Sequence, residues 1–181
     1  MSAFPNWQKF AVRQRRQTTG CIPTGYEIIL RAAEIPGIDF DCFQEEFDLD
    51  KDGGKPRNNF ESVALEIKGK YPFVEFKSEG FPQGQGSVKV AKIEEFMLKK
   101  RPLLVSLARK PIWGEGGWHI MLAVDSTQDE LHLLQGVDGL GKAHVMRIRK
   151  ADIAKIHDEF DGGKEIAYLL TPEKESPSPS P

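Results

Sequence analysis

The spacing of apolar residues changes near the middle of this chain, from a helical period to a strand period. In the first half, the apolar residues after the first cysteine recur on one helix face, at Tyr26, Ile29, Leu30 and Ala33. In the second half, the segment GWHIMLAVD (residues 117–125) alternates between two faces, as a strand does. Helices followed by strands, without βαβ alternation, predict an α+β fold in which N-terminal helices pack against a C-terminal antiparallel sheet.

Four segments of the first half have helical spacing. The first begins at Cys21, has Pro23 in its first turn, where a missing N–H costs little, and is ended by Pro36-Gly37. The others are an acidic helix marked by Phe40, Phe43 and Phe47, one over residues 60–67 with Asn58 or Asn59 as N-cap, and one over residues 90–100. We expect residues 80–86, GFPQGQG, to form a flexible loop between the helical half and the sheet.

Five segments of the second half are typical of strands. They are RPLLVSLAR (101–109), GWHIMLAVD (117–125), ELHLLQ (130–135), HVMRIR (144–149) and EIAYLL (165–170). The turn STQD joins the second and third segments, so we expect these two to form an antiparallel hairpin. A helix over residues 150–160 is expected before the last strand.

Residues 1–170 have the length and apolar content of one domain. The full chain has 181 residues, of which 39% are hydrophobic, which suffices for one core but hardly for two. Residues 171–181, TPEKESPSPSP, lack side chains able to pack, so we expect a disordered Ser/Pro tail.

Charge and cysteine content argue against several classes of protein. The net charge of -2 gives no general attraction to nucleic acid or to an anionic membrane. No apolar run approaches the ~18 residues of a membrane span, and the first ten residues lack the apolar segment of a secretory signal. Two cysteines do not make a disulfide framework in a domain of this size, so we expect a cytoplasmic protein with reduced thiols.

Two glycine-rich segments resemble ligand-binding loops without meeting their requirements. GVDGLGKA (136–143) has the spacing of a phosphate-binding loop, but Ala143 replaces the Ser or Thr that binds Mg²⁺, so we expect a hairpin loop. DLDKDGGKPRNN (48–59) begins like a calcium loop, but Asn59 stands where a bidentate Glu is needed. None of the four histidines has metal-ligand spacing to a cysteine or carboxylate, so we expect neither metal nor cofactor.

Cys21 and His119 are the residues whose types and positions suggest chemistry. A thiol attacks as its thiolate, and the partial positive charge at a helix start lowers a thiol's pKa. Cys21 stands at such a start, while His119 opens a strand after GEGG, where small residues leave room for a substrate backbone. The alternative is that each of these residues is merely buried in the core or exposed on the surface and has no chemical role. We expect the other cysteine, Cys42, to be a small core residue beside Phe43.

The sequence resembles papain-like cysteine peptidases in two segments, QTTGCIPTG and GGWHIMLAVD. It also resembles them in the segment RPLLVSLA before the histidine and the segment LHLLQG after it. The nearest group comprises the bacterial peptidase domains that cleave double-glycine leader peptides from bacteriocins. In that group a Cys opens the first helix, a Gly-His strand follows an apolar strand, and a polar residue ends the next strand. The resemblance covers roughly residues 14–170, chiefly as an order of elements.

The resemblance implies a role for each matching residue. Cys21 is expected to be the nucleophile, and His119 the general base and acid. Gln135 stands where the family has an Asp or Asn that orients the histidine, and Asp138 is the alternative orienting residue. Ile22 stands where the family usually has Gly.

The family also has a glutamine about six residues before the cysteine, which donates to the oxyanion. Arg15 occupies that spacing here, and Gln14 and Gln17 lie on either side of it. Gln17 is the preferred candidate because it is close to Cys21, although a deletion must then be assumed.

The expected function is therefore that of a cysteine peptidase or amidohydrolase, acting on a peptide or protein through a thioester. A transferase on the same fold is an alternative, and so is a binding module whose site has drifted. The cleft is expected between the helices and the sheet, with Trp113 and Trp118 as candidate walls. The sequence does not indicate the substrate or the oligomeric state.

Overall fold

The computed structural model describes residues 4–15, 20–48 and 59–170. Within these ranges, a short 3-10 helix (Trp7–Lys9) precedes helices α1 (Cys21–Ala32), α2 (Phe43–Asp48) and α3 (Phe60–Lys70). Strand β1 (Phe76–Gly80), helix α4 (Gly86–Leu98), strand β2 (Leu103–Ala108) and helix α5 (Lys110–Trp113) follow. The chain continues with strands β3 (Trp118–Ser126), β4 (Glu130–Val137) and β5 (Ala143–Arg149), helix α6 (Lys150–Glu159) and strand β6 (Glu165–Leu169).

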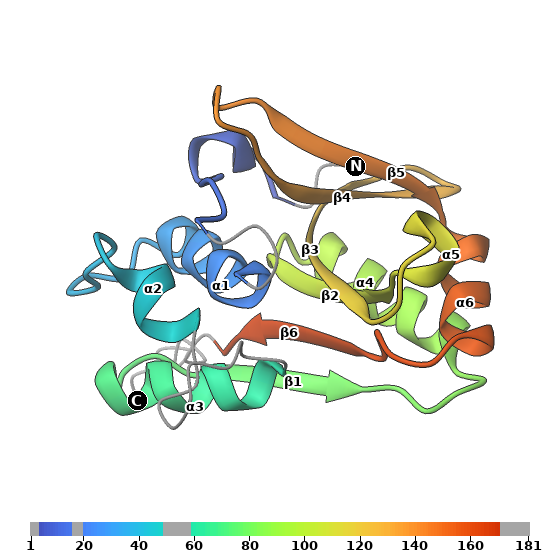
Figure 1. Cartoon of the computed structure of the whole chain (residues 1–181), viewed down its shortest axis with the longest axis horizontal. Helices are drawn as coiled ribbons and strands as arrows, with labels where there is room; N and C mark the ends of the chain where they lie inside the picture. The colour runs from blue at the N-terminus through green and yellow to red at the C-terminus, as the bar shows by residue number, and fades with distance from the viewer. Residues whose placement is uncertain (1–3, 16–19, 49–58, 171–181) are drawn as a thin grey trace, which may run out of the picture.

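The strands form one six-stranded sheet in the order β1-β6-β2-β3-β4-β5 (Figure 1). Each pair of neighbours is antiparallel. Strands β3 and β4 form the hairpin expected from the turn at residues 126–129, with Leu122 opposite Leu134. The expectation of an α+β fold with an antiparallel sheet is confirmed, but the sheet is not wholly C-terminal, because β1 lies before α4 and pairs with β6.

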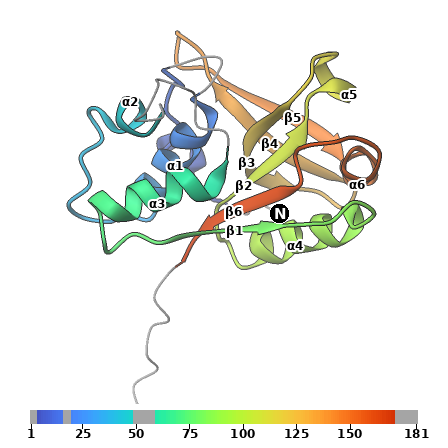
Figure 2. The same ribbon diagram turned by 60° about the horizontal axis from the view of Figure 1, so that its bottom comes forward.

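Helices cover the sheet on both faces (Figure 2). Helices α1, α2 and α3 pack on one face, against Leu104, Ile120 and Leu122. Helices α4 and α6 pack on the other face, against Val105 and Met121. Because neighbouring residues of a strand point to opposite faces, β2 and β3 contribute to both cores.

The predicted helices and strands are present, and the described residues contain three additional elements, the 3-10 helix Trp7–Lys9, β1 and α5. Asn59 is the N-cap of α3, since its side chain accepts a hydrogen bond of 2.7 Å from the N–H of Ser62. The sequence patterns missed β1 and α5, which have five and four residues. The segment at residues 80–86 joins β1 to α4, so it does not divide a helical half from a sheet half. Phe81 in this segment is buried.

Gly25 allows α1 to lie close to the sheet. A Cβ at Gly25 would come within 2.5 Å of Cδ2 of Leu104, a buried residue of β2. The hydroxyl of Tyr26, the next residue, donates a hydrogen bond of 3.0 Å to the carbonyl oxygen of Phe60 at the start of α3. These contacts set the position of α1, and therefore of Cys21 at its first residue, relative to the strands.

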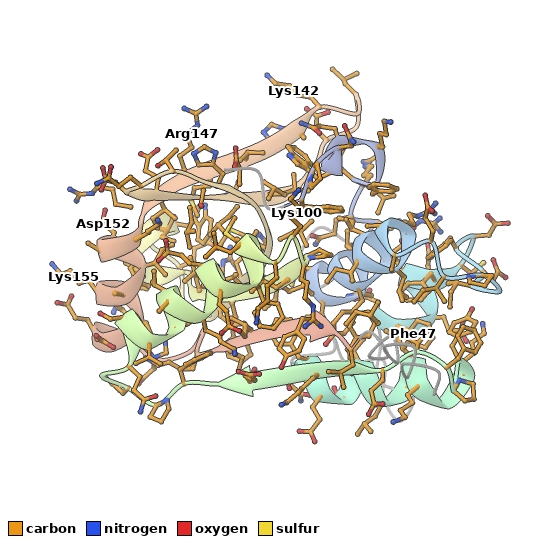
Figure 3. The ribbon with its side chains drawn as sticks, turned by 180° about the vertical axis from the view of Figure 1, so that it is seen from behind. Phe47, Lys100, Lys142, Arg147, Asp152 and Lys155 are labelled. Atoms are coloured by element: carbon orange, nitrogen blue, oxygen red, sulfur yellow. The ribbon has the colours of Figure 1, made fainter. Side chains whose placement is uncertain are left out.

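The outer edge of the sheet is charged. Lys142 and Arg147 point outward from the β4–β5 hairpin, and Asp152 and Lys155 point outward from α6 (Figure 3). Charged side chains on an edge strand such as β5 disfavour pairing with a strand of another molecule.

Candidate active site

Cys21 is the first residue of α1, with Gly20 as the N-cap. Its thiol is free and partly buried. Burial raises the pKa of this thiol above its ordinary value, while the backbone N–H groups of Ile120 and Ile22 act in the opposite direction. The expectation of a lowered pKa is therefore not met, because desolvation of the thiolate outweighs the helix start. The contact with Ile120 brings the sulfur beside the residue that follows His119.

His119 is the second residue of β3 and pairs with Leu107 of β2. Its imidazole meets the indole of Trp113 edge-on, with ring centroids 5.4 Å apart and an interplanar angle of 87°. Burial and, to a smaller extent, the positive charge of Arg109 lower the pKa of His119 to about 4. The imidazole is therefore neutral at pH 7, which is the form that accepts a proton.

Cys21 and His119 line the same pocket, which has a volume of about 210 Å³. The other described residues that line it are Gln14, Arg109, Trp113, Trp118 and Gln135. The pocket thus brings together three of the predicted site residues and both tryptophans expected as walls. Arg109, at the end of the apolar segment that forms β2, is not among the sequence-based candidates. An arginine at the end of a strand carries no signal of a site by itself.

Gln135 and Asp138, the two candidates for orienting His119, have different surroundings. Gln135 lines the pocket, and its Nε2 lies 3.7 Å from the sulfur of Met146. Asp138 accepts hydrogen bonds from the N–H groups of Leu140 and Lys142, and its Oδ2 lies 3.1 Å from Nε2 of His144. These partners lower the pKa of Asp138, with the Lys142 N–H contributing most. Asp138 therefore stabilises the β4–β5 turn and pairs with His144.

Of the two glutamines considered for the oxyanion, Gln14 lines the pocket. Gln17 lies outside the described residues. Buried Gln44 holds the backbone on both sides of Gln14: its Nε2 donates to the carbonyl oxygen of Arg13 at 3.0 Å, and its Oε1 accepts from the N–H of Arg15 at 2.9 Å.

Gln44 is itself held by α1. Its Nε2 also donates to Oε2 of buried Glu27 at 2.8 Å, and its Oε1 accepts from the Thr24 hydroxyl at 2.8 Å. Arg31 pairs with the other oxygen of Glu27 at 2.7 Å. The segment that carries Gln14 is thereby tied to the helix that carries Cys21. Sequence reasoning missed this role of Gln44, since a glutamine within a short acidic helix gives no signal of it.

The remaining sequence candidates do not form a second site in the part of the chain that the structure describes. Residues 136–143 include the end of β4 and the turn to β5, as expected for a hairpin. Most of the calcium-like segment, residues 49–58, lies outside the described residues. The prediction that Cys42 is a core residue is wrong: Cys42 is exposed because Phe43, the next residue, occupies the core.

No group of three or more His, Cys, Asp or Glu side chains suited to a metal occurs within residues 4–15, 20–48 and 59–170. In the same ranges, the helices are too short or too polar to cross a membrane. The sequence matches no family model, and its comparison with curated proteins finds no match. The roles of the residues in the pocket therefore rest on their chemistry and geometry.

Proposed function

We propose that this protein is a cysteine hydrolase of the papain-like type that cleaves peptide or amide bonds through a thioester. The observation that carries the proposal is the shared pocket of Cys21 and His119. A thiol at a helix start and a neutral imidazole on a facing strand are the two groups that this chemistry needs.

In the proposed reaction, His119 takes the thiol proton as the sulfur of Cys21 attacks the carbonyl carbon. The oxyanion that forms accepts hydrogen bonds from the Cys21 N–H and from the side-chain amide of Gln14. His119 then gives its proton to the leaving amine as the C–N bond breaks. Water, deprotonated by His119, attacks the thioester, and the C–S bond breaks to release the acid and the thiol.

The pKa shifts favour a neutral pair in the resting protein. Burial raises the pKa of Cys21, and the pKa of His119 is about 4, so a thiol and an imidazole coexist at pH 7. Proton transfer then accompanies the attack on the substrate, instead of preceding it. Gln135 suits this scheme as a neutral acceptor for an imidazole N–H, although it stabilises an imidazolium less than a carboxylate does.

The second candidate function is that of a binding module with the same fold, whose site has lost its catalytic activity. It is favoured by the raised pKa of the thiol and by the longer side chain of Gln135, which stands where the family that the sequence resembles has an Asp or Asn. Both features reduce the reactivity of a cysteine that is otherwise well placed.

Cleavage of a proteome-derived peptide library distinguishes the two candidates. The library is incubated with the wild type and with the Cys21→Ala, His119→Ala and Cys42→Ala variants, and new N-termini are identified by mass spectrometry. A hydrolase produces the same new termini with the wild type and Cys42→Ala, and none with the other two. Absence of Cys21-dependent products supports the binding module. Products that carry an added primary amine in place of water identify a transferase.

A further inference from the structure

Arg109 is the one charged side chain among the described residues that line the pocket at pH 7. Two tryptophans form the walls, and the remaining lining groups are amides, a thiol and an imidazole that is neutral at this pH. A single cation among otherwise neutral lining groups gives the pocket a net positive charge, which attracts an anion.

The backbone of Arg109 is held at a fixed place in the fold. Its N–H donates to the carbonyl oxygen of Gly117 at 2.9 Å, next to the β2–β3 pair. Its own carbonyl oxygen accepts from the N–H groups of Ile112 and Trp113 at 3.0 and 2.8 Å. The guanidinium therefore projects from a rigid junction between β2 and α5.

Glu115 is the acidic partner of Arg109, through Nη2 of the guanidinium. The side chains are 38% and 63% exposed, so water screens the pair and competes with it. A guanidinium has five N–H donors, more than one carboxylate uses, and it binds carboxylates well in a two-pronged geometry. A second carboxylate can therefore join Arg109 or displace Glu115.

The charge of Arg109 also acts on His119, since it contributes to the lowered pKa of that residue. A carboxylate bound to Arg109 therefore lies close enough to affect the catalytic pair. Its negative charge offsets the repulsion between the guanidinium and the imidazolium that forms during the reaction.

We propose that Arg109 makes the pocket select substrates that carry a carboxylate beside the scissile amide. The carboxylate belongs either to an acidic side chain or to the free C-terminus of a peptide. This inference rests on the proposed function for its enzymatic meaning, but the anion preference of the pocket can be measured without hydrolysis.

The measurement is alkylation of Cys21 by two reagents of similar size, iodoacetate, which is anionic, and iodoacetamide, which is neutral. The ratio of their rates at Cys21 is followed by peptide mass spectrometry at low salt. We expect Arg109→Gln to lower this ratio about five-fold, and Glu115→Gln to raise it by freeing Arg109. The effect of Arg109 shrinks as salt is added.

Two controls accompany this measurement. Arg149→Gln removes an equal charge from an exposed pair with Asp152, which is not among the residues lining the pocket, and leaves the Cys21 ratio unchanged. Cys42, an exposed thiol among acidic residues, reports any effect of the variants that does not involve the pocket. A Cys21 ratio that is unaffected by Arg109→Gln overturns the inference. Failure of both reagents to alkylate Cys21, at a pH where its thiolate forms, shows a closed pocket and overturns it as well.

The peptide library then identifies the source of the carboxylate. Cleavage next to internal Asp or Glu indicates an acidic side chain, and release of a single C-terminal residue indicates the α-carboxylate. Either preference is lost in Arg109→Gln. An Arg109-dependent alkylation ratio without any cleavage contradicts the proposed hydrolase but leaves the anion site in place. Cleavage without a preference for carboxylates supports the hydrolase and contradicts the anion site.

Discussion

The indole of Trp113 packs edge-on against the imidazole of His119, with ring centroids 5.4 Å apart and planes at 87°. Trp113 is the last residue of α5, and both rings line the pocket that also contains Cys21. An edge-to-face contact of this kind restricts rotation of the smaller ring and contributes about 1 kcal/mol beyond simple burial. Trp113 therefore helps to orient His119 from outside its own strand.

Replacing Trp113 with Ala is expected to lower the rate of Cys21 acylation about ten-fold, which corresponds to about 1.4 kcal/mol. The reason is that the imidazole loses the contact that restricts its orientation. Trp113→Phe is the matched control, because it retains an aromatic edge. Acylation rates measured with an activated ester check the prediction. Equal losses in the two variants contradict an orienting role for the indole.

The acid limb of the pH-rate profile is expected to fall near pH 4. His119 must be neutral to accept the thiol proton, and its pKa is about 4, so acylation stays possible down to about pH 5. Arg109→Gln removes a positive charge that disfavours the imidazolium, so the pKa of His119 rises and the limb moves to higher pH. NMR titration of His119 in both proteins checks the direction, and a shift to lower pH contradicts it.

The Cys21 thiol is expected to ionise above the ordinary range of a cysteine, because burial raises its pKa. Absorbance of the thiolate near 240 nm, measured in a Cys42→Ser background, isolates this group. The helix start alone predicts reaction with alkylating agents well below pH 8, so the two physical effects lead to opposite results. Full ionisation below pH 8 indicates a preformed thiolate and contradicts the neutral resting pair.

Gln44→Leu is expected to destabilise the protein by about 3 kcal/mol or more, since several buried polar groups lose their partner and each costs about 1–3 kcal/mol. The groups include the carboxylate of Glu27 and the carbonyl oxygen of Arg13. Gln83→Leu is the control, because Gln83 has one exposed hydrogen bond, to the carbonyl oxygen of Asp158. Urea unfolding measures both. Similar free energies of unfolding for the two variants contradict the role of Gln44.

The buried side chain of Lys89 is expected to make the free energy of unfolding depend on pH. Its Nζ is buried and donates to the carbonyl oxygens of Ser106 and Gly163, both at 2.6 Å. Burial, and then the nearby charge of Lys164, lower its pKa to about 7, whereas the unfolded chain keeps an ordinary lysine pKa. Between pH 7 and about pH 10 the unfolded state therefore binds more protons, so this contribution to stability rises with pH.

The Lys89→Met variant isolates that contribution. The free energy of unfolding of the wild type, relative to the variant, is expected to rise by up to about 1.4 kcal/mol per pH unit above pH 7. Denaturant unfolding from pH 7 to pH 9.5 measures the difference. A difference that stays constant or falls over this range contradicts a neutral Lys89 in the folded protein.

Periodicity predicted the long elements because they are buried on a regular face. It missed β1, whose sequence FKSEG is short and mostly polar and whose pairing with β6 joins residues about 90 positions apart. It placed Cys42 in the core because the neighbouring phenylalanines suggest an apolar face, but α2 begins at Phe43, so Cys42 precedes the helix and is exposed. Propensity and spacing do not carry such tertiary information.

The candidate site was predictable only as residue types at the starts of a helix and a strand. Cys21 and His119 follow from that reasoning, whereas Gln135, near the end of a strand, follows only from the family resemblance. The pKa of His119, the place of Arg109 and the ties made by Gln44 depend on contacts between distant segments. The oxyanion candidate shows the same limit, since Gln14 lines the pocket although the sequence favours Gln17.

Labelling by a peptide electrophile of low intrinsic reactivity, such as an acyloxymethyl ketone, tests the central claim most directly. Intact-mass and peptide mass spectrometry measure the extent and the site of labelling in the wild type and in His119→Ala. The Cys21–His119 pair predicts one label per chain, on Cys21, which is lost in His119→Ala while exposed Cys42 stays unmodified. Labelling of both cysteines to the same extent, or labelling of Cys21 that does not depend on His119, contradicts the pair.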